Sequence, residues 1–138
     1  MAKESGLAWT TCTVDDGAGA AEAIVNDVVA LDIGHPRGVF DWTGLDKSAH
    51  ERGLGLADFS ISLQVIFNDA ASPSSHDCFK TVPSTSQLRT TTLSISGQAY
   101  ATAPEVYYTD YPLSRGADGS FGATVPGVLG DGAVPAWT

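Results

Sequence analysis

The side chains that could carry out catalysis or bind a metal follow no recognised spacing in this sequence. His35, His50 and His76 lie far apart, and none has a second histidine or a cysteine at a metal-ligand spacing. Ser75, His76 and Asp77 supply the residue types of a hydrolytic triad. Consecutive side chains point in divergent directions, however, and a triad is defined by its geometry. The sequence therefore predicts no enzyme, no metal site and no cofactor.

Glycine-rich and acidic stretches lead to the same conclusion. Residues 17–19 and 53–55 lack the third glycine and the strand–helix context of a nucleotide-binding loop. The acidic residues lie singly along predicted turns, without the pattern of a calcium-binding loop. A carboxylate pair for glycoside hydrolysis stays open, although no observation favours one.

Charge and cysteine content narrow the possible partners and compartment. Seven Lys and Arg against sixteen Asp and Glu give a net charge of -9, so no basic surplus is present to neutralise phosphates. Cys12 and Cys78 are expected to be buried free thiols, because no feature marks a secreted chain. Residues 1–7 contain no apolar signal segment, and no later run is long enough to cross a bilayer. We expect folding in a cytoplasm and no tight nucleic-acid binding.

The clearest structural signal is a strict alternation between residues 57 and 68. Large apolar side chains occupy every second position there, namely Phe59, Ile61, Leu63, Val65 and Phe67. Small polar residues lie between them, and a similar alternation covers residues 87–97. Because side chains of a strand alternate between its two faces, both runs predict half-buried strands. The positions expected on the wet faces are Ser60, Ser62, Gln64, Thr92, Ser94 and Ser96.

Weaker patterns complete a single, mainly β domain with one short helix. Strands are predicted at residues 7–14, at 106–113 and from residue 121 to 125, with two short pieces in 20–33 that break near Asn26. In the 106–113 strand, Tyr107, Thr109, Tyr111 and Leu113 are expected to share one face. A helix is predicted over residues 72–82, with Ser72 as its N-cap and Pro73 in its first position.

Three segments have no sustained period and are expected to form arms, at residues 1–7, 34–56 and 127–138. The long loop 34–56 is rich in apolar residues, so we expect an extended arm or hairpin that packs on something, such as another subunit. Trp9, Trp42 and Trp137 lie in or beside these segments. They either plug the ends of a β-sandwich or anchor contacts between subunits. Charges that could set the register of such contacts are Asp46, Lys47, Glu51 and Arg52.

Taken as a whole, the sequence resembles those of the major tail tube proteins of long-tailed, non-contractile phages that infect actinobacteria. No single motif carries this resemblance. It is spread over residues 3–10 (KESGLAWT), 14–16 (VDD), 24–28 (IVNDV), 36–39 (PRGV), 43–49 (TGLDKSA), 67–70 (FNDA), 79–86 (FKTVPSTS) and 134–137 (VPAW).

The resemblance implies a fold, an assembly and a set of partners. It implies a β-sandwich or barrel-like tail tube fold with a short flanking helix, in rings of six that stack into a hollow tube. The inner sheets would form one barrel, and the long loop and termini would reach neighbouring subunits or rings. Other partners would be the tape measure, terminator and distal tail proteins. The virion tail would be assembled in the host cytoplasm and would pass double-stranded DNA without binding it tightly. The strand-end acids Asp58, Asp69, Glu105 and Asp110 are candidates to line the channel.

Two other classes of protein stay open from the sequence. A capsid decoration or head–tail joining protein could share a small acidic β-domain with extended arms, and it would be monomeric or trimeric alone. A carbohydrate-binding β-sandwich would use exposed Trp and Tyr side chains as stacking platforms, and it would bind glycans as a monomer.

Overall fold

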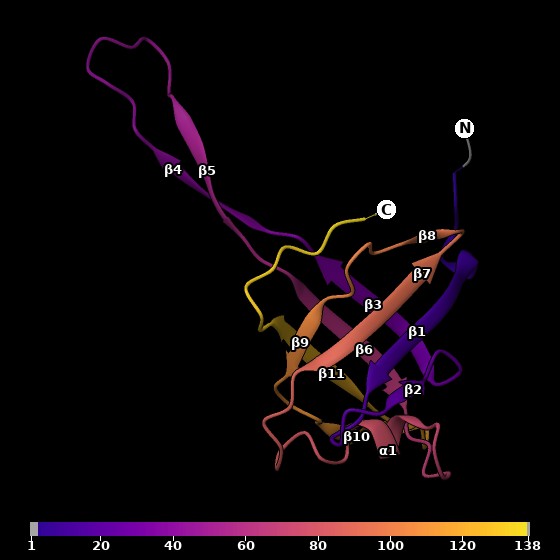
Figure 1. The fold of residues 1–138 in the computed structure, drawn as a ribbon. Helices are drawn as coiled ribbons and strands as arrows, with labels where there is room; N and C mark the ends of the chain where they lie inside the picture. The colour runs from indigo at the N-terminus through magenta and orange to yellow at the C-terminus, as the bar shows by residue number, and fades with distance from the viewer. Residues whose placement is uncertain (1–2, 138) are drawn as a thin grey trace.

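Antiparallel strands make up most of the chain, as the alternating sequence pattern predicts. The computed structural model describes residues 3–137 (Figure 1). The two helical segments are a 3-10 helix η1 (Gly6–Ala8) and the helix α1 (Ser75–Phe79). The strands are β1 (Trp9–Asp15), β2 (Ala21–Ala23), β3 (Val28–Gly34), β4 (Arg37–Asp41), β5 (Arg52–Ala57), β6 (Ser60–Ile66), β7 (Arg89–Ile95), β8 (Gln98–Ala99), β9 (Glu105–Tyr108), β10 (Leu113–Arg115) and β11 (Phe121–Leu129). The mainly β fold with one short helix is confirmed.

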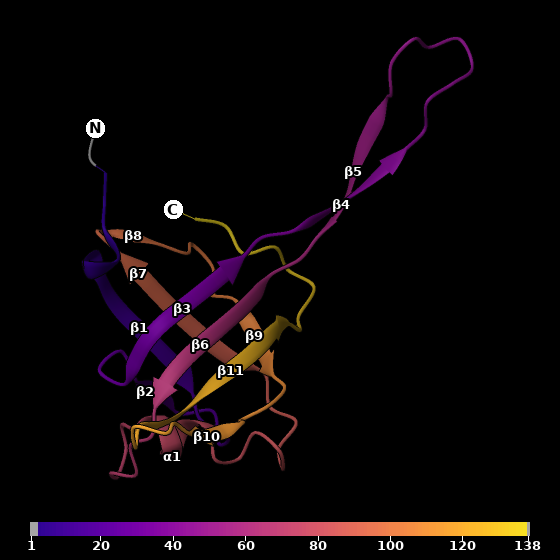
Figure 2. The same cartoon turned by 180° about the vertical axis from the view of Figure 1, so that it is seen from behind.

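The main sheet folds over on itself to form two layers. Its strands are hydrogen-bonded in the order β2-β1-β7-β9-β11-β6-β3, with β8 beside β7 and β10 beside β11. Strands β1 and β7 lie in one layer, and β3, β6 and β11 lie in the other (Figures 1 and 2). Strand β9 pairs with both β7 and β11 and joins the layers along one side. The opposite side, between β1 and β3, has no such connection, so the sandwich is open there.

The alternating run of β6 packs on the core as predicted. Phe59, Ile61, Leu63 and Val65 are at most 3% exposed, while the residues between them point outward. From the facing layer, Leu93 of β7 is buried against the same core. The last member of the predicted row departs from the pattern: Phe67 lies beyond the end of β6 and is only half-buried, against the rings of His76 and Phe121. Its prediction as a core residue is wrong, because the strand ends one residue before it.

The predicted helix is shorter than expected and begins later. The N-cap of α1 is Ser74, whose hydroxyl oxygen accepts a hydrogen bond from the Asp77 amide at 3.2 Å. The expected cap Ser72 and first residue Pro73 therefore lie outside the helix. Tertiary contacts select this start, because Ser75 donates from its amide to Asp27 and from its hydroxyl to the Ile66 carbonyl. Several serines could cap a helix here, and docking on the end of β6 decides between them.

The predicted aromatic strand 106–113 is two separate strands with the opposite facing. Val106 and Tyr108 of β9 are buried and Tyr107 is exposed, because the Tyr108 hydroxyl lies 2.8 Å from that of Thr91 inside the core. Pro112 separates β9 from β10 and has no amide hydrogen to donate to a sheet. The shared face expected for Tyr107, Thr109, Tyr111 and Leu113 is therefore wrong.

The chain ends also differ from the predicted arms. Strand β11 continues to Leu129, so residues 127–129 belong to the sheet, not to the C-terminal arm. At the other end, η1 occupies part of the predicted N-terminal arm, and residues 3–5 before it are exposed. Residues 1–2 and 138 of the predicted arms lie outside the described residues. The broken pair of strands predicted in 20–33 is confirmed as β2 and β3, with a turn between them.

Candidate assembly surfaces

The segment between β3 and β6 is a hairpin that projects away from the sandwich (Figures 1 and 2). Strands β4 and β5 pair with each other, with Val39 opposite Leu54 and Asp41 opposite Arg52, and form a separate two-stranded sheet. Just beyond the paired strands, the Trp42 amide donates to the Glu51 carbonyl at 3.1 Å. The sequence prediction of an arm or hairpin is thus confirmed in its hairpin form.

Large apolar side chains remain exposed along the hairpin. The six are Val39, Phe40, Trp42, Leu45, Leu54 and Leu56, and their exposed fractions range from 44% to 108%. The rings of Phe40 and Trp42 pack edge to face with centroids 4.7 Å apart. A Cβ atom at Gly53 would lie 2.6 Å from the Phe40 ring, so the glycine makes room for that ring. A soluble domain rarely keeps so much apolar surface on a projecting element without a partner for it.

The polar tip of the hairpin is held by its own hydrogen bonds. The Asp41 carboxylate accepts hydrogen bonds from the amide and hydroxyl of Thr43 and lies 2.8 Å from the His50 ring. These contacts, with those from Thr43 the largest, lower the pKa of the Asp41 carboxyl. Lys47 and Glu51 form an exposed ion pair at 3.9 Å. Lys47 and Glu51 are two of the four charges predicted to fix the register between subunits, and they pair with each other within the hairpin.

The other two predicted register charges lie at different places on the hairpin. Asp46 is exposed in the tip loop, and Arg52 is the first residue of β5. Both are exposed and therefore accessible to a neighbouring molecule, and the described structure shows no ion pair between them.

The outer face of the layer containing β3, β6 and β11 carries small side chains. Ser60, Ser62 and Gln64 project from it, as the alternation predicts. Their neighbours across the pairing registers are Ala30, Asp32, Gly34, Thr124, Pro126 and Val128. Asp32, opposite Ser62, places a negative charge in this face, and the sequence analysis missed it. An irregularity between Val28 and Ala30 breaks the alternation of β3. The outward-facing positions of this strand could therefore not be predicted from the sequence.

Two of the three remaining predicted wet positions lie on the opposite side of the molecule. Thr92 and Ser94 project from the outer face of β7, beside Thr11 and Thr13 of β1. Because β6 and β7 bury their other faces in one core, these outer faces point in opposite directions. Ser96 lies on neither face, since it follows β7 in a turn with φ 48°. The six residues therefore do not line one surface.

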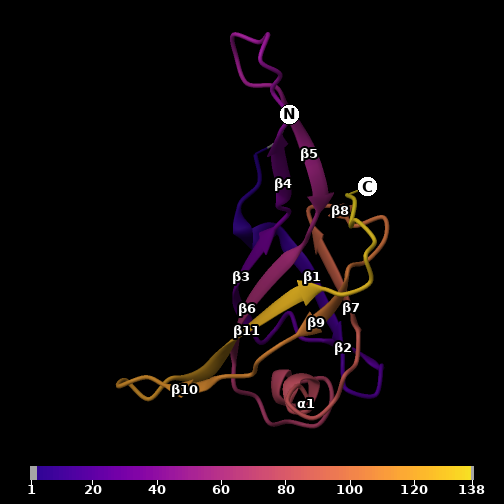
Figure 3. The ribbon, with the colours of Figure 1, turned by 90° about the vertical axis from the view of Figure 1, so that its left-hand side faces the viewer.

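The β3–β6–β11 layer has one free strand edge on each side. Among the described residues, β3 pairs only with β6, and β10 pairs only with β11, at residues 121–123. Farther along β11, at residues 127–129, β9 continues the sheet into the facing layer. The hairpin of β10 and β11 extends away from the sandwich (Figure 3). Exposed apolar side chains accompany these edges, namely Val29, Ile66, Leu113 and Phe121. Residues of β6, β10 and β11 line a groove of about 580 Å³ between these elements.

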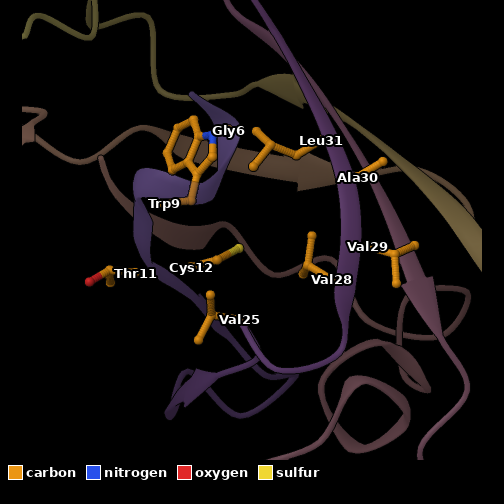
Figure 4. Close-up of a pocket in the computed structure, with 9 residues that line it drawn as sticks. All are labelled: Gly6, Trp9, Thr11, Cys12, Val25, Val28, Val29, Ala30 and Leu31. Atoms are coloured by element: carbon orange, nitrogen blue, oxygen red, sulfur yellow. The ribbon is translucent and has the colours of Figure 1, made fainter. Parts of the chain in front are cut away.

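The three tryptophans have different environments. The Trp137 ring stacks on Tyr100 with centroids 4.1 Å apart, and the Ala101 amide donates to the Ala136 carbonyl at 2.7 Å. Trp9 packs against the core and lines a pocket of about 310 Å³ on the open side of the sandwich (Figure 4). Only Trp42 lies on an element away from the sandwich. Trp9 and Trp137 contact the chain's own domain, and a role of any of the three tryptophans in subunit contacts stays a prediction.

The remaining predicted residues lie apart from one another. Each histidine contacts a different partner: His35 lies 2.7 Å from the Tyr100 hydroxyl, His50 contacts Asp41, and His76 lies 3.1 Å from the Tyr111 hydroxyl. Cys12 and Cys78 are buried free thiols, as predicted.

The four candidate channel acids are equally dispersed. Asp58, Asp69 and Asp110 are exposed at strand ends, while Glu105 accepts a hydrogen bond from the Thr90 hydroxyl. Within residues 3–137, no helix is both long and apolar enough to span a bilayer.

Comparison with solved structures identifies the architecture. The fold matches a chain in the virion of the native gene transfer agent particle, with a TM-score of 0.75 and 16% sequence identity over 99% of both chains. It matches equally a chain in the tail of the empty gene transfer agent particle, refined with C6 symmetry. The likeness establishes the fold. No protein-family model matches the sequence, and no curated protein matches it significantly.

Proposed function

We propose that this chain is the subunit of a phage-type tail tube, built from stacked rings of six around a channel for DNA. One observation carries the proposal: the layer that has free strand edges at β3 and β10 also gives rise to an exposed apolar hairpin. A subunit with these features has contacts available both around a ring and along a tube. The full-length likeness to a chain of a six-fold symmetric tail particle supports this assembly.

Around the ring, the free edge of β3 would lie beside β10 of the neighbouring subunit. Edge strands present unpaired backbone groups that readily pair with another chain. Burying Val29 and Leu113 at this junction would add apolar contact to the backbone hydrogen bonds. Repeated around the ring, the junction would join the β3–β6–β11 layers into one continuous wall.

Along the tube, the hairpin of β4 and β5 would contact the adjacent ring. Its strands pair only with each other among the described residues, so its apolar side chains are available to a neighbour. Trp42 is the best anchor, because aromatic residues that fill a pocket contribute most to protein interfaces. The exposed charges Asp46 and Arg52 would then set the register.

The channel would be lined by the outer face of β3, β6 and β11. Serine, threonine and glutamine side chains can hold a water layer against passing DNA, and no basic residue lies among the outward positions of these three strands. Asp32, repeated in every subunit, would repel phosphates. The wall would therefore conduct DNA without the counterion-releasing contacts that produce tight binding.

The more specific expectations rest on the sequence resemblance alone. They are an actinobacterial phage with a long, non-contractile tail, a virion location after assembly in the host cytoplasm, a role in genome ejection, and the tape measure, terminator and distal tail proteins as partners.

Electron microscopy of the purified protein at high concentration tests the proposal directly. We expect hollow tubes with six-fold symmetric cross-sections. A matched variant, with residues 44–49 replaced by a short Gly-Ser turn, should remain folded but form no long tubes. A protein that stays monomeric or trimeric at every concentration would instead favour the capsid decoration or joining class.

A further inference from the structure

Three carboxylates meet where the turn after β1 and strand β2 face the helix α1, at the lower end of the sandwich in Figure 1. Asp16 lies in the turn, Glu22 in β2 and Asp77 in α1. One carboxylate oxygen from each of these three residues lies within 4.8 Å of one from each of the others. Carboxylates repel at such distances unless a proton or a cation lies between them.

Glu22 distinguishes this cluster from an ordinary acidic surface. Its side chain is 2% exposed and lies opposite Val14 in the β1–β2 pair. Both carboxylate oxygens are buried, and within residues 3–137 neither accepts a hydrogen bond of normal geometry. A buried carboxylate is strongly unfavourable unless something compensates its charge. The cluster thus contains a buried, unsatisfied ligand group that is directed at two other carboxylates.

Two cationic groups lie nearby, and one of them, Lys80, attracts Glu22 and Asp16 electrostatically without contacting either at ion-pair distance. Lys80 pairs with Oδ1 of Asp77 at 2.8 Å and is itself exposed. The buried guanidinium of Arg89 donates to the carbonyls of Asp15 and Cys78 and to the Thr81 hydroxyl. On the turn, Asp16 uses Oδ1 to accept from two amides, those of Ala18 and Ala20.

These contacts leave a defined set of oxygens for a ligand. They are the Oδ2 atoms of Asp16 and Asp77 and the two oxygens of Glu22, beside which lie the Ser72 hydroxyl and the Ser74 amide. Burial raises the pKa of the Glu22 carboxyl, and Asp77 raises it further against the opposing effects of Ser72 and Ser74. The pKa of Asp77 is lowered, chiefly by Lys80.

We propose that Asp16, Glu22 and Asp77 bind a divalent cation of the calcium class. An all-oxygen set of carboxylates suits hard cations, and Ca²⁺ tolerates irregular arrangements that Mg²⁺ does not. The bound ion would compensate Glu22 and connect the β1–β2 turn to α1. This departs from the sequence prediction of no metal site. The three carboxylates come from separate elements and form no loop motif. Their proximity could therefore not be predicted from the spacing of residues in the sequence.

The test uses the full chain, unassembled, after treatment with a chelator and its removal. CaCl₂ is titrated at pH 7 and constant ionic strength, with isothermal titration calorimetry and thermal unfolding as readouts. We expect saturable binding of one Ca²⁺ per chain and a rising unfolding midpoint, with a much weaker response to MgCl₂. Glu22→Gln should abolish both responses, while Glu4→Gln, an exposed control, should leave them unchanged. If Glu22→Gln does not fold, Asp16→Asn serves as the second variant, because its remaining Oδ1 keeps the turn hydrogen bonds.

A proton shared between Glu22 and Asp77 is the competing account, and the pH dependence distinguishes it. A carboxyl whose pKa is raised in the folded state stabilises below its ordinary value of 4.5, and this stability is lost as pH rises through the folded-state pKa. No saturable Ca²⁺ binding, together with a stability loss above pH 4.5 that Glu22→Gln removes, would overturn the proposal. Equal Ca²⁺ binding by Glu22→Gln would also overturn it, since the ion would then lie elsewhere. These readouts concern the single chain and do not depend on the tube proposal.

Discussion

Replacing Trp42 with alanine separates assembly from folding. Trp42 is 60% exposed and packs its ring on that of Phe40, in a hairpin that pairs with no other strand among residues 3–137. Its loss should change the free energy of unfolding of the sandwich by no more than about 0.5 kcal/mol. In a tube it would become a buried aromatic anchor, whose truncation typically costs about 2 kcal/mol or more. A loss of about 2 kcal/mol per subunit corresponds to a roughly 30-fold rise in the critical concentration for polymerisation.

Trp137→Ala is the matched control, because it removes the same side chain from a site on the chain's own domain. The Trp137 ring stacks on Tyr100, so this change should lower the free energy of unfolding by about 1 kcal/mol and leave the critical concentration nearly unchanged. The assay is sedimentation of polymer over a protein concentration series, with urea unfolding measured in parallel. Equal critical concentrations for wild type and Trp42→Ala would refute the assignment of the hairpin to assembly.

Three further outcomes are expected. Phe59→Ala should lower the free energy of unfolding by about 3–5 kcal/mol, and Phe67→Ala by clearly less, because only Phe59 is fully buried; urea unfolding that reverses this order would contradict the described end of β6. Wild-type protein should show no gel shift of DNA at physiological salt, whereas Asp32→Lys should form tubes that bind DNA; strong binding by wild type would contradict the channel assignment. Burial raises the pKa of Cys12 to about 12 and also raises that of Cys78, so a disulfide reagent at pH 8 should label both thiols only as fast as the chain unfolds.

Strand facing could be predicted where burial is decided by side chains of clearly different polarity. Along residues 59–65, large apolar side chains alternate with serine and glutamine, so the period of two identifies the core face from Phe59 to Val65. In β9 the same reasoning fails, because tyrosine suits either face. Tyr108 is buried because its hydroxyl forms a hydrogen bond with that of Thr91, which belongs to a different strand, β7.

The sequence could not predict which strands share a layer of the sandwich, or which residues from separate segments come into contact. Alternation places Ser62 and Thr92 on the strand faces away from the core, yet it carries no information on whether two strands share a layer. Likewise, the stacking of Trp137 on Tyr100 requires the C-terminal segment to return across the sandwich, and no local pattern encodes that path. The acidic cluster around Glu22 belongs to the same class, since three separate elements create it.

The two proposed contact types differ in a way that bears on how assembly would be controlled. The β10 edge is only Leu113–Arg115, so a single ring junction offers few backbone hydrogen bonds. The hairpin offers more apolar surface, but ordering it against a neighbour costs conformational entropy. Each contact alone is therefore weak, and a net charge of -9 per chain opposes both. In the proposed tube, a subunit that joins a growing end would make both contacts together, since one engaged contact raises the effective concentration of the other. Free subunits would accordingly stay dispersed until a formed ring presents both sites together, and added salt would weaken the repulsion that delays this step.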